Sequence, residues 1–466
     1  MNLANTDGYI VNKTYNEIKI GDTASMENTL TLEDIKVFAV MSGDVSPEHV
    51  DPQYAKKEEN HGLVGHGMWS GSLIAAVLET QLPGPGTFYD KQCFDFKAPI
   101  KIGDTITASV KVIEKNEDNR LKLDCKCTNQ DGVVVLEGKA EVIAPTEKVN
   151  RKKMTMPEVT LRENGRFEQM IKDTEHLAPV RTAVVWAMDD VSLSGAVEAA
   201  KRTLITPVLV GSESEIRRVA KECDIDISSC EIVDAADEHK AVAVAVAMAA
   251  SGEVETLMKG SLHTDHLMSA VVSRNGGLRA GRRLSHIFAM DVPTYHKPLY
   301  ITDGAINIYP DLMVKMDIVQ NAIDLARAVT PNITPKVAIL SAVETVNVQI
   351  QSTIDATALC KMADRGQITG GILDGPLAFD NAVSAEAARI KNIQSKVAGD
   401  ADILVAPNLE AGNMIAKQLT YLAEAQSAGI VLGAKVPIIL TSRADSALSR
   451  TGSCAVAALY VYANRK

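Results

Sequence analysis

The spacing of hydrophobic residues divides the chain into two parts that follow different rules. In the first part a helical pattern begins after the N-cap candidate Thr31, and residues 66–80 are apolar or small on nearly every side, which is typical of a buried helix. Hydrophobic and polar positions then alternate through Ile106–Val112, Leu121–Cys127 and Val133–Ile143, with turn residues between these runs. This succession predicts an antiparallel sheet wrapped around one helix, an α+β domain.

Beyond residue 157 short apolar runs alternate with helical stretches. The runs predicted as strands are Thr182–Ala187, Pro207–Gly211, Thr256–Met258, Tyr300–Thr302, Val337–Leu340, Ile403–Ala406 and Pro437–Leu440. Such alternation predicts an α/β domain, with a mainly parallel sheet covered by helices on both faces. The stretch at 147–157 is charged and aperiodic and ends in a proline, so it is predicted to be a linker between a first domain at 1–146 and a second at 158–466.

Composition narrows the choice of partners. The chain has 466 residues, too many for one hydrophobic core, and its 46% hydrophobic and 23% charged residues are ordinary for globular proteins. The net charge of −11 argues against non-specific binding to nucleic acid or to an anionic membrane surface. A polar amino terminus and seven cysteines without a CxxC pair favour a reduced, cytoplasmic protein that holds no zinc.

Two groups of residues in the first part can combine into a catalytic site. Asp44 and His49 are five residues apart, so on a regular helix they would point apart, but a proline between them predicts an irregular turn in which both can reach one water. Gly65-His-Gly67 comes just before the buried helix and leaves its first N–H groups open to a carbonyl oxygen. One alternative is a surface loop with a capping aspartate and an exposed histidine. Another is a metal site at His61 and His66, for which the sequence offers no third ligand.

The motifs Asp44-Val-Ser-Pro-Glu-His49 and Gly65-His-Gly-Met68 resemble those of the MaoC-like (R)-specific enoyl-CoA hydratases, over about residues 10–145. The resemblance implies a hot-dog fold, in which an antiparallel sheet surrounds a central helix. It also implies that Asp44 and His49 activate the water that adds across a 2-enoyl-CoA, and that the amide of Gly67 holds the thioester oxygen. The family's usual asparagine before the proline is replaced by Ser46, which weakens the support around the pair but leaves the pair itself intact.

Polar residues also follow a strand near the end of the chain. The segment Val436–Asp445 passes from an apolar run into Ser442, Arg443 and Asp445, and Ser446 then opens a helix. A hydroxyl, a guanidinium and a carboxylate beyond a strand end suit a small anion, because arginine offers a planar fork for phosphate oxygens. The plain alternative is a capped helix with a surface ion pair.

Two further segments offer groups for an anion. Lys259-Gly-Ser-Leu-His-Thr264 lies between a strand and a helix, and its glycine lets backbone amides approach an anion closely. The candidate binding residues there are Lys259, Gly260, Ser261, His263 and Thr264. The basic segment Gly277–His286, with Arg283 and Ser285, is either a solvated face or a guard for phosphate groups.

These segments resemble the phosphate acetyl/butyryltransferase family over about residues 160–466. The resemblance implies a two-lobed α/β/α fold of the isocitrate dehydrogenase type, with lobes at about 158–297 plus 442–466 and at about 298–441. It also implies reversible transfer of an acyl group between CoA and phosphate, with Ser442 and Arg443 matching the family's Ser-Arg pair and Lys259–Thr264 its phosphate-side loop. The acetyltransferases carry their catalytic aspartate further along, where Ser449 stands, so Asp445 matches a butyryltransferase-like spacing.

Together the resemblances predict a bifunctional CoA-thioester enzyme, an enoyl-CoA hydratase fused to a phosphate acetyl- or butyryltransferase. Its substrates would be acyl-CoA, CoA, inorganic phosphate and acyl phosphate, with no tightly bound cofactor and no metal. Because hot-dog folds pair through their sheets, a homo-oligomer is expected, either a dimer or a larger assembly such as a hexamer.

Two other functions compete with this prediction. An oxidoreductase of the isocitrate type would share the two-lobed fold, but the sequence lacks the metal-binding aspartate cluster and the glycine-rich cofactor loop. The other alternative makes the first domain a catalytically silent module for CoA binding or oligomerisation.

Overall fold

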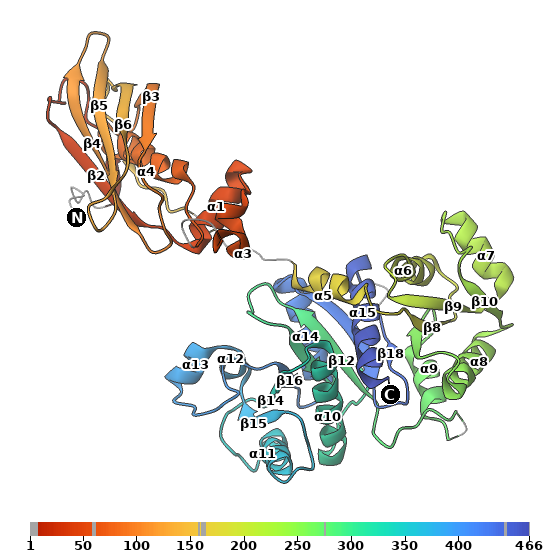
Figure 1. Ribbon diagram of the computed structural model, residues 1–466. Coiled ribbons are helices and arrows are strands. Elements are labelled where there is room, and N and C mark those ends of the chain that lie inside the picture. The colour runs from red at the N-terminus through yellow and green to blue at the C-terminus, as the bar shows by residue number, and fades with distance from the viewer. Residues whose placement is uncertain are drawn as a thin grey trace. The chain divides into compact units, whose positions relative to one another are not determined.

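The computed structural model describes residues 8–57, 62–156, 159, 165–274, 276–441 and 445–465. The chain divides into two compact units, Met1–Leu161 and Arg162–Lys466 (Figure 1). Within the described ranges, no helix has the length and hydrophobicity that crossing a bilayer requires.

The first unit is an antiparallel sheet packed against one helix. Its elements are β1 (Tyr9–Val11), β2 (Thr23–Thr29), α1 (Leu32–Ser42), α2 (Pro47–Val50), α3 (Pro52–Ala55), α4 (Gly67–Thr80), β3 (Phe88–Phe96), β4 (Thr105–Lys115), β5 (Arg120–Thr128), β6 (Val134–Ile143) and β7 (Asn150–Lys152). Five strands form the sheet, in the order β2-β4-β5-β6-β3. Ile74 and Val77 of α4 share one core with the alternating buried residues of β4 and β5, such as Ile106 and Leu123. The predicted hot-dog architecture is confirmed.

The ends of α1 and α4 place the residues of interest in this unit. Thr31 caps α1 as predicted, because its side chain accepts a hydrogen bond from the amide of Asp34 while the Asp34 carboxylate accepts one from the amide of Thr31. The helix ends at Gly43, which adopts the left-handed conformation with φ of 77°. Asp44 therefore starts the turn that follows α1, and α4 begins directly after His66.

Part of the segment predicted as a linker is a strand. Residues 150–152 form β7, which pairs antiparallel with β1, with Tyr9 opposite Lys152. Its side chains are polar and exposed, so the sequence pattern gives no strand signal, but its backbone groups find partners in β1. These three residues thus belong to the first unit, while the boundary itself stays a prediction.

The second unit contains one sheet of eleven strands, in the order β10-β9-β8-β11-β18-β17-β12-β13-β16-β14-β15. Its strands are β8 (Val180–Val185), β9 (Ile205–Gly211), β10 (Glu231–Asp234), β11 (Thr256–Lys259), β12 (Ser285–Asp291), β13 (Leu299–Thr302), β14 (Lys336–Leu340), β15 (Ile372–Leu377), β16 (Ile403–Val405), β17 (Gln426–Leu432) and β18 (Ile438–Ile439). Its helices are α5 (Arg166–Thr174), α6 (Asp190–Lys201), α7 (Glu213–Glu222), α8 (Glu238–Ser251), α9 (Thr264–Val272), α10 (Leu312–Val329), α11 (Gln351–Asp364), α12 (Phe379–Val383), α13 (Ala385–Ile390), α14 (Leu409–Leu422) and α15 (Ala447–Asn464). All seven predicted strands are present within two residues at each end.

The sheet reverses direction near its centre. Strands β9, β8, β11 and β18 run parallel to one another, but β17 pairs antiparallel with both β18 and β12. Strand β13 is also antiparallel to β12, and β16, β14 and β15 follow its direction. The strands of the two halves therefore have their carboxyl ends at opposite edges of the sheet. The sheet is also continuous across the predicted lobe boundary, because β18 of the predicted lobe 298–441 pairs with β11 of the other.

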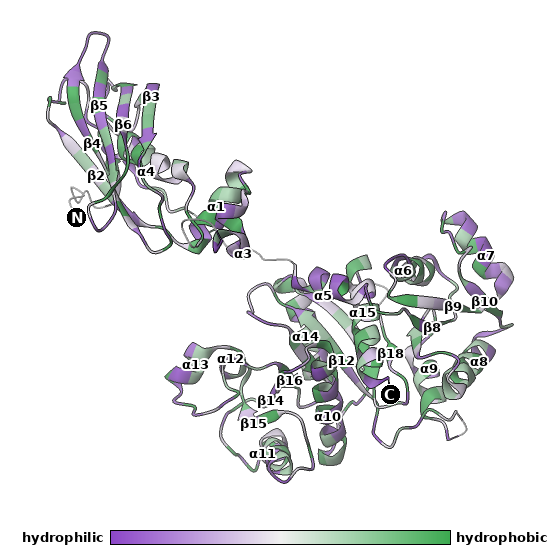
Figure 2. Cartoon of the chain, in the orientation of Figure 1, coloured by the Kyte–Doolittle hydropathy of each residue, from purple (hydrophilic) through white to green (hydrophobic). Residues whose placement is uncertain are grey.

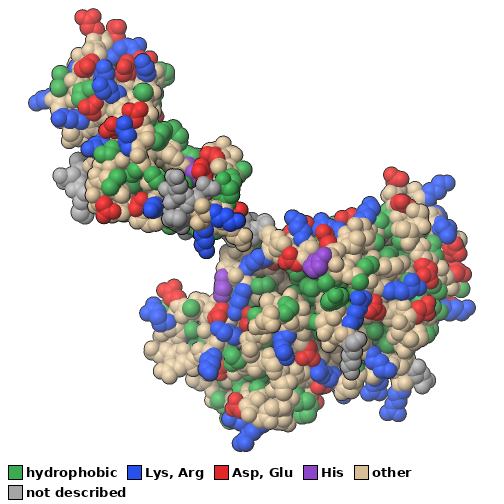
Figure 3. Space-filling view, viewed as in Figure 1, with side chains coloured by type: hydrophobic (Ala, Val, Ile, Leu, Met, Phe, Trp, Pro, Cys, Tyr) green, Lys and Arg blue, Asp and Glu red, His purple; other side chains and the backbone are tan. Residues whose placement is uncertain are grey.

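Helices cover both faces of this sheet, as predicted. Alternate residues of β8 point into different cores: Val184 packs with residues of α6, α10 and α15, whereas Val185 packs with residues of α8 and α9. Strand β9 is mostly hydrophobic in Figure 2, and the outer helix α7 is largely hydrophilic. Lys and Arg side chains are interspersed with Asp and Glu over the face of the second unit seen in Figure 3.

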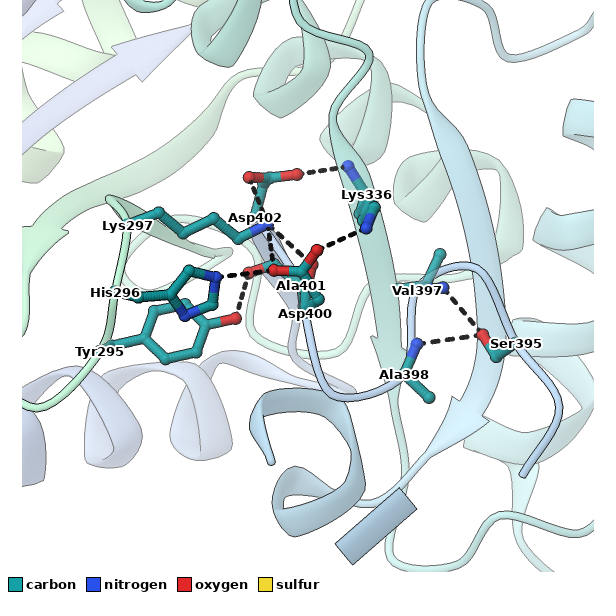
Figure 4. Close-up of polar contacts among 10 residues, drawn as sticks. All are labelled: Tyr295, His296, Lys297, Lys336, Ser395, Val397, Ala398, Asp400, Ala401 and Asp402. Carbon is teal, nitrogen blue, oxygen red and sulfur yellow. Dashed lines mark hydrogen bonds and ion pairs between the residues drawn. The ribbon is translucent and has the colours of Figure 1, made fainter. Parts of the chain in front are cut away.

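A charged network joins the beginnings of β13, β14 and β16 (Figure 4). The Asp400 carboxylate accepts hydrogen bonds from His296 Nε2 at 2.8 Å and from Lys336 Nζ, and Lys297 Nζ lies 2.9 Å from its Oδ1. Lys297 also lies 2.9 Å from Asp402. Partial burial alone would raise the pKa of Asp400, but the hydrogen bonds from Lys336, Lys297 and His296 hold it well below its usual range.

Candidate active sites

Three side chains meet beside the start of α4 in the first unit: Asp44, His49 and His66. One carboxylate oxygen of Asp44 and one ring nitrogen of each histidine all lie within 4.8 Å of one another. Asp44 follows the end of α1, and His49 lies in the short helix α2, so the irregular turn between them brings the two together as the sequence predicted.

The hydrogen bonds of His49 define which of its ring nitrogens is available. Its Nδ1 lies 2.8 Å from the carbonyl oxygen of Val64, and since a carbonyl can only accept, Nδ1–H is the donor. The lone pair of the neutral ring is then on Nε2, which lies 3.5 Å from the carboxylate of Glu48. His49 is only 8% exposed, so the alternative of an exposed histidine in a surface loop is wrong.

The Asp44 carboxylate lies at the outer side of this group. Its side chain is 53% exposed, its Oδ1 accepts a hydrogen bond from the amide of Ser46 at 3.3 Å, and its Oδ2 lies 4.0 Å from His66 Nε2. An imidazole whose Nε2 carries the lone pair can take a proton from a water that this carboxylate holds.

Close packing explains the two glycines at the start of α4. A Cβ added to Gly65 would lie 2.6 Å from Leu30 Cδ2, and one added to Gly67 would lie 3.1 Å from Phe96 Cδ1. Gly67 is the first residue of α4, where amides have no partner within the helix. Its N–H can thus serve a developing negative charge next to the Asp44–His49 pair.

The same donor set changes the metal alternative. His61 lies outside the described residues. The structure instead groups His66 with His49 and Asp44, so three possible metal ligands are present where the sequence had offered no third one. Two imidazoles and one carboxylate are a set that a divalent transition metal accepts. The absence of a metal stays a prediction.

In the second unit, two predicted anion-binding segments leave neighbouring strands at the same edge of the sheet. Strands β11 and β18 pair in parallel with Met258 opposite Ile439, so Gly260 and Thr441 begin their loops side by side. Ser442 and Arg443 lie outside the described residues. Asp445 and Ser446 follow them, and Ser446 caps α15 by accepting a hydrogen bond from the amide of Ser449 at 3.1 Å.

Gly260 fixes the course of the first loop. Its amide donates to the carbonyl oxygen of Val185 at 2.9 Å, and the amide of Ser261 donates to that of Trp186 at 2.9 Å. A Cβ at residue 260 would lie 2.5 Å from each of these oxygens, so only glycine fits. Lys259, Ser261 and Thr264 are half-buried, and His263 is the exposed residue before α9.

Arg283 and Ser285 lie away from this loop, and their binding role stays a prediction. The strand register puts Lys259 level with Phe288, so Ser285 lies three residues nearer the opposite edge, roughly 10 Å along β12. Ser285 is fully buried, and its hydroxyl accepts a hydrogen bond from Asn321 of α10 at 2.9 Å, so its side chain faces the core. Arg283 is exposed near the same edge, with its amide bonded to Asp317.

Comparison with known proteins identifies both units. Residues 238–458 match the family model described as "Phosphate acetyl/butaryl transferase", and a phosphate acetyltransferase of Rhizobium meliloti is 59% identical over 301 residues, which cover 65% of this chain and 95% of that protein. The chain belongs to the phosphate acetyl/butyryltransferase family. In the same family, a phosphate butyryltransferase of Clostridium beijerinckii is 40% identical over 299 residues, 64% of this chain and 99% of that protein. Residues 16–130 match the model described as "MaoC like domain", so the family's enzyme is here fused to such a domain.

The family's fold is confirmed by a solved structure. A branched-chain phosphotransacylase from Enterococcus faecalis V583 is 29% identical, with a TM-score of 0.54, and the match covers 61% of this chain and 99% of that one. The predicted two-lobed α/β/α fold of the second unit agrees with this similarity.

Three residues have surroundings that the sequence pattern did not reveal. Burial lowers the pKa of His286 to about 3, and among the described residues its Nδ1 has no hydrogen-bond partner. Burial raises the pKa of Asp303, although the amides of the following turn donate to its carboxylate. Both lie near the edge of the sheet opposite Gly260. The third is His66, for which the sequence offered only a metal role; its contacts join segments more than 20 residues apart.

Proposed function

We propose that this chain is a bifunctional enzyme of CoA thioesters in the cytoplasm. The first unit hydrates a 2-enoyl-CoA, and the second transfers an acetyl or butyryl group reversibly between CoA and phosphate. The substrates are acyl-CoA, CoA, inorganic phosphate and acyl phosphate, and neither reaction needs a tightly bound cofactor or a metal. Family membership supports the transfer, and the MaoC-like domain supports the hydration.

The observation that carries the hydratase is that the buried His49 bonds the Val64 carbonyl through Nδ1, which leaves the lone pair on Nε2, beside the Asp44 carboxylate. In this mechanism Nε2 takes a proton from a water held by Asp44, and the hydroxide adds to C3 of the enoyl thioester. Negative charge then moves to the thioester oxygen, where the N–H of Gly67 at the start of α4 stabilises it until the proton taken up by His49 is delivered to C2. A silent first domain would have no need of this arrangement.

The transfer in the second unit depends mainly on positioning. An oxygen of phosphate attacks the thioester carbonyl, the C–S bond breaks, and CoA leaves as its thiol or thiolate. Arg443 binds the phosphate oxygens, and Ser442 donates a hydrogen bond to the leaving sulfur or to the acyl oxygen. In the reverse reaction Asp445 takes the proton from the thiol of CoA. Lys259, Ser261, His263 and Thr264 surround the phosphate from the neighbouring loop, whose start lies beside Thr441.

We also propose that the chain is a homo-oligomer built through the sheet of its first unit. Strand β3 lies at an edge of that sheet and carries the exposed side chains of Phe88 and Phe96, which are 67% and 51% exposed. An edge strand with free backbone groups and aromatic side chains is a natural surface for a second copy.

The experiment that tests the proposal assays both reactions on the full chain. We expect the wild type to hydrate crotonyl-CoA and to release CoA from acetyl-CoA or butyryl-CoA when phosphate is present. Loss of the carboxylate that holds the water for the base His49 should make Asp44→Asn roughly 100- to 10,000-fold slower in hydration and leave transfer unchanged. Arg443→Lys keeps the charge but loses the fork, which should lower kcat/KM for phosphate about 30- to 1,000-fold and leave hydration unchanged.

A matched control comes from the next turn of the first unit. Asp51 caps α3 through the amides of Gln53 and Tyr54, and asparagine caps equally well, so Asp51→Asn should keep both activities. A wild type that transfers acyl groups but leaves crotonyl-CoA unchanged would make the first unit a silent module.

A further inference from the structure

His66 is buried in the centre of the first unit's site, yet the proposed mechanism gives it no role. It is 3% exposed and lies directly before α4. Its Nε2 lies 3.0 Å from the backbone carbonyl oxygen of Asp44, 22 residues earlier in the chain. Its ring stacks on that of His49, with 3.9 Å between the centroids and 32° between the planes.

The partners of His66 define its tautomer. The Asp44 carbonyl can only accept, so Nε2–H of His66 donates to it and the neutral ring keeps its lone pair on Nδ1. That Nδ1 is buried, and none of the described residues offers it a hydrogen bond. Leaving a buried polar atom unpaired costs free energy. The hydrogen bond made by Nε2 must therefore offset this cost for a histidine to be favourable at this position.

The bond to Asp44 acts on a turn whose other hydrogen bonds are local, such as that from the amide of Asp44 to Ser42 Oγ at 3.2 Å. Asp44 begins the turn after Gly43, its side chain is 53% exposed, and its carboxylate is oriented by one long hydrogen bond from the amide of Ser46. A donor directly before the buried helix α4 therefore fixes an exposed turn. The stacking contact on the other side of the same ring limits the orientation of His49.

We propose that His66 is a positioning residue for hydration, which holds the Asp44 carbonyl and the His49 ring in place beside the amide of Gly67. This inference rests on the proposed hydratase function of the first unit. In this role His66 acts through its contacts with Asp44 and His49. Its adjacency to Gly67 ties the base and the site of the developing negative charge to the same end of α4.

Two substitutions separate the hydrogen bond from the ring. His66→Gln places an amide N–H near the position of Nε2 and keeps the bond to Asp44 but not the stacking, whereas His66→Phe keeps an aromatic ring and loses the donor. A displacement of about 1 Å in a catalytic group costs on the order of 100-fold in rate. We therefore expect kcat for crotonyl-CoA hydration to fall about 10- to 100-fold in His66→Phe, with KM within about threefold, and most of the loss to be recovered in His66→Gln.

The control variant removes the other aromatic neighbour of His66. The ring of Phe38 lies 4.9 Å from that of His66, so Phe38→Leu loosens the packing but leaves both nitrogens and their bonds in place. It should lower the unfolding temperature and change kcat by less than about twofold. Phosphate-dependent acyl transfer by the second unit, measured on every variant, gives the concentration of intact enzyme.

Three outcomes would contradict the positioning role of His66. If His66→Phe hydrates as fast as the wild type, or if its kcat falls only in proportion to its lost stability and as much as in Phe38→Leu, the positioning role is wrong. If chelation abolishes wild-type hydration and Zn²⁺ restores it, His66 is a metal ligand with Asp44 and His49 instead. If the wild type does not hydrate crotonyl-CoA, the proposed function fails first, and His66 has no reaction to support.

Discussion

The substitution Gly260→Ala tests whether the Lys259–Thr264 loop is part of the transferase site. A Cβ at this position would lie 2.5 Å from the carbonyl oxygens of both Val185 and Trp186. Contacts below 3.0 Å essentially do not occur at real Cβ atoms, so the loop must move away by at least about 0.5 Å. Because these oxygens belong to the backbone, they cannot simply rotate aside, and the hydrogen bonds that the amides of Gly260 and Ser261 donate to them must lengthen.

The expected magnitudes follow from this displacement. Overpacking of this kind costs about 1–3 kcal/mol, so the second unit should unfold several degrees lower than in the wild type. A shift of about 1 Å costs on the order of 100-fold in rate. A shift of about 0.5 Å should therefore lower kcat/KM for phosphate about tenfold. Initial rates with phosphate and acyl-CoA varied separately, together with a thermal unfolding curve, measure both effects. Hydration of crotonyl-CoA should not change.

A glycine elsewhere in the second unit supplies the control. A Cβ at Gly165 would meet no atom within 4 Å, and its φ of −175° suits any residue, so Gly165→Ala should keep both stability and kinetics. A Gly260→Ala enzyme of lowered stability but wild-type phosphate kinetics would remove the loop from the site. Wild-type stability in that variant would contradict the steric argument itself.

Two further predictions concern charged groups of the second unit. Lys315 and Asp355 form a buried ion pair with 2.7 Å between Nζ and Oδ2, so Lys315→Met should cost about 3–5 kcal/mol in urea unfolding by leaving a buried carboxylate unpaired, and adding Asp355→Leu should recover most of that loss. At Asp400 the folded-state pKa lies below the unfolded value of about 4, so the carboxylate's contribution to stability is present above that value and lost as the pH falls through the folded pKa. In urea unfolding, the wild type should therefore be more stable than Asp400→Asn by a larger margin at pH 5 than at pH 3. The difference between the two margins should be small because the Asp400 side chain is 38% exposed. Equal margins at both pH values would contradict the argument.

Elements whose side chains alternate between core and solvent could be predicted from the sequence. In β4 and β5 every second residue is buried, and α4 is buried through most of its length, so local patterns determine these elements. The pair Asp44 and His49 could also be predicted, because five residues and one turn join them. The partners of His66 could not, since its bond to Asp44 joins residues 22 positions apart that only the tertiary fold brings together.

The strands that were missed lack the alternating pattern for physical reasons. Strand β3 lies at an edge, and most of its residues are exposed. Strand β12 is buried on both faces and begins with Ser285 and His286, so polar residues occur where a core strand is expected to be apolar. Strand β15 contains Gly375 and Pro376, which usually mark a turn.

The missed strands determine where Arg283 and Ser285 lie. Residues that follow strands meet at one edge of a sheet only while all strands run parallel. Five residues connect β17 to β18 and seven connect β12 to β13, whereas parallel neighbours need a crossover of about a dozen or more. Recognition of β12 and β17 would thus have predicted the reversal at the centre of the sheet from connection length alone. The reversal keeps Gly260 and Thr441 together, because β11 and β18 both lie on one side of it, and it puts Arg283 at the edge where β13 ends. Which side chains can share a substrate is therefore determined in this fold by strand direction, which depends on the short connections between strands and not on the motifs themselves.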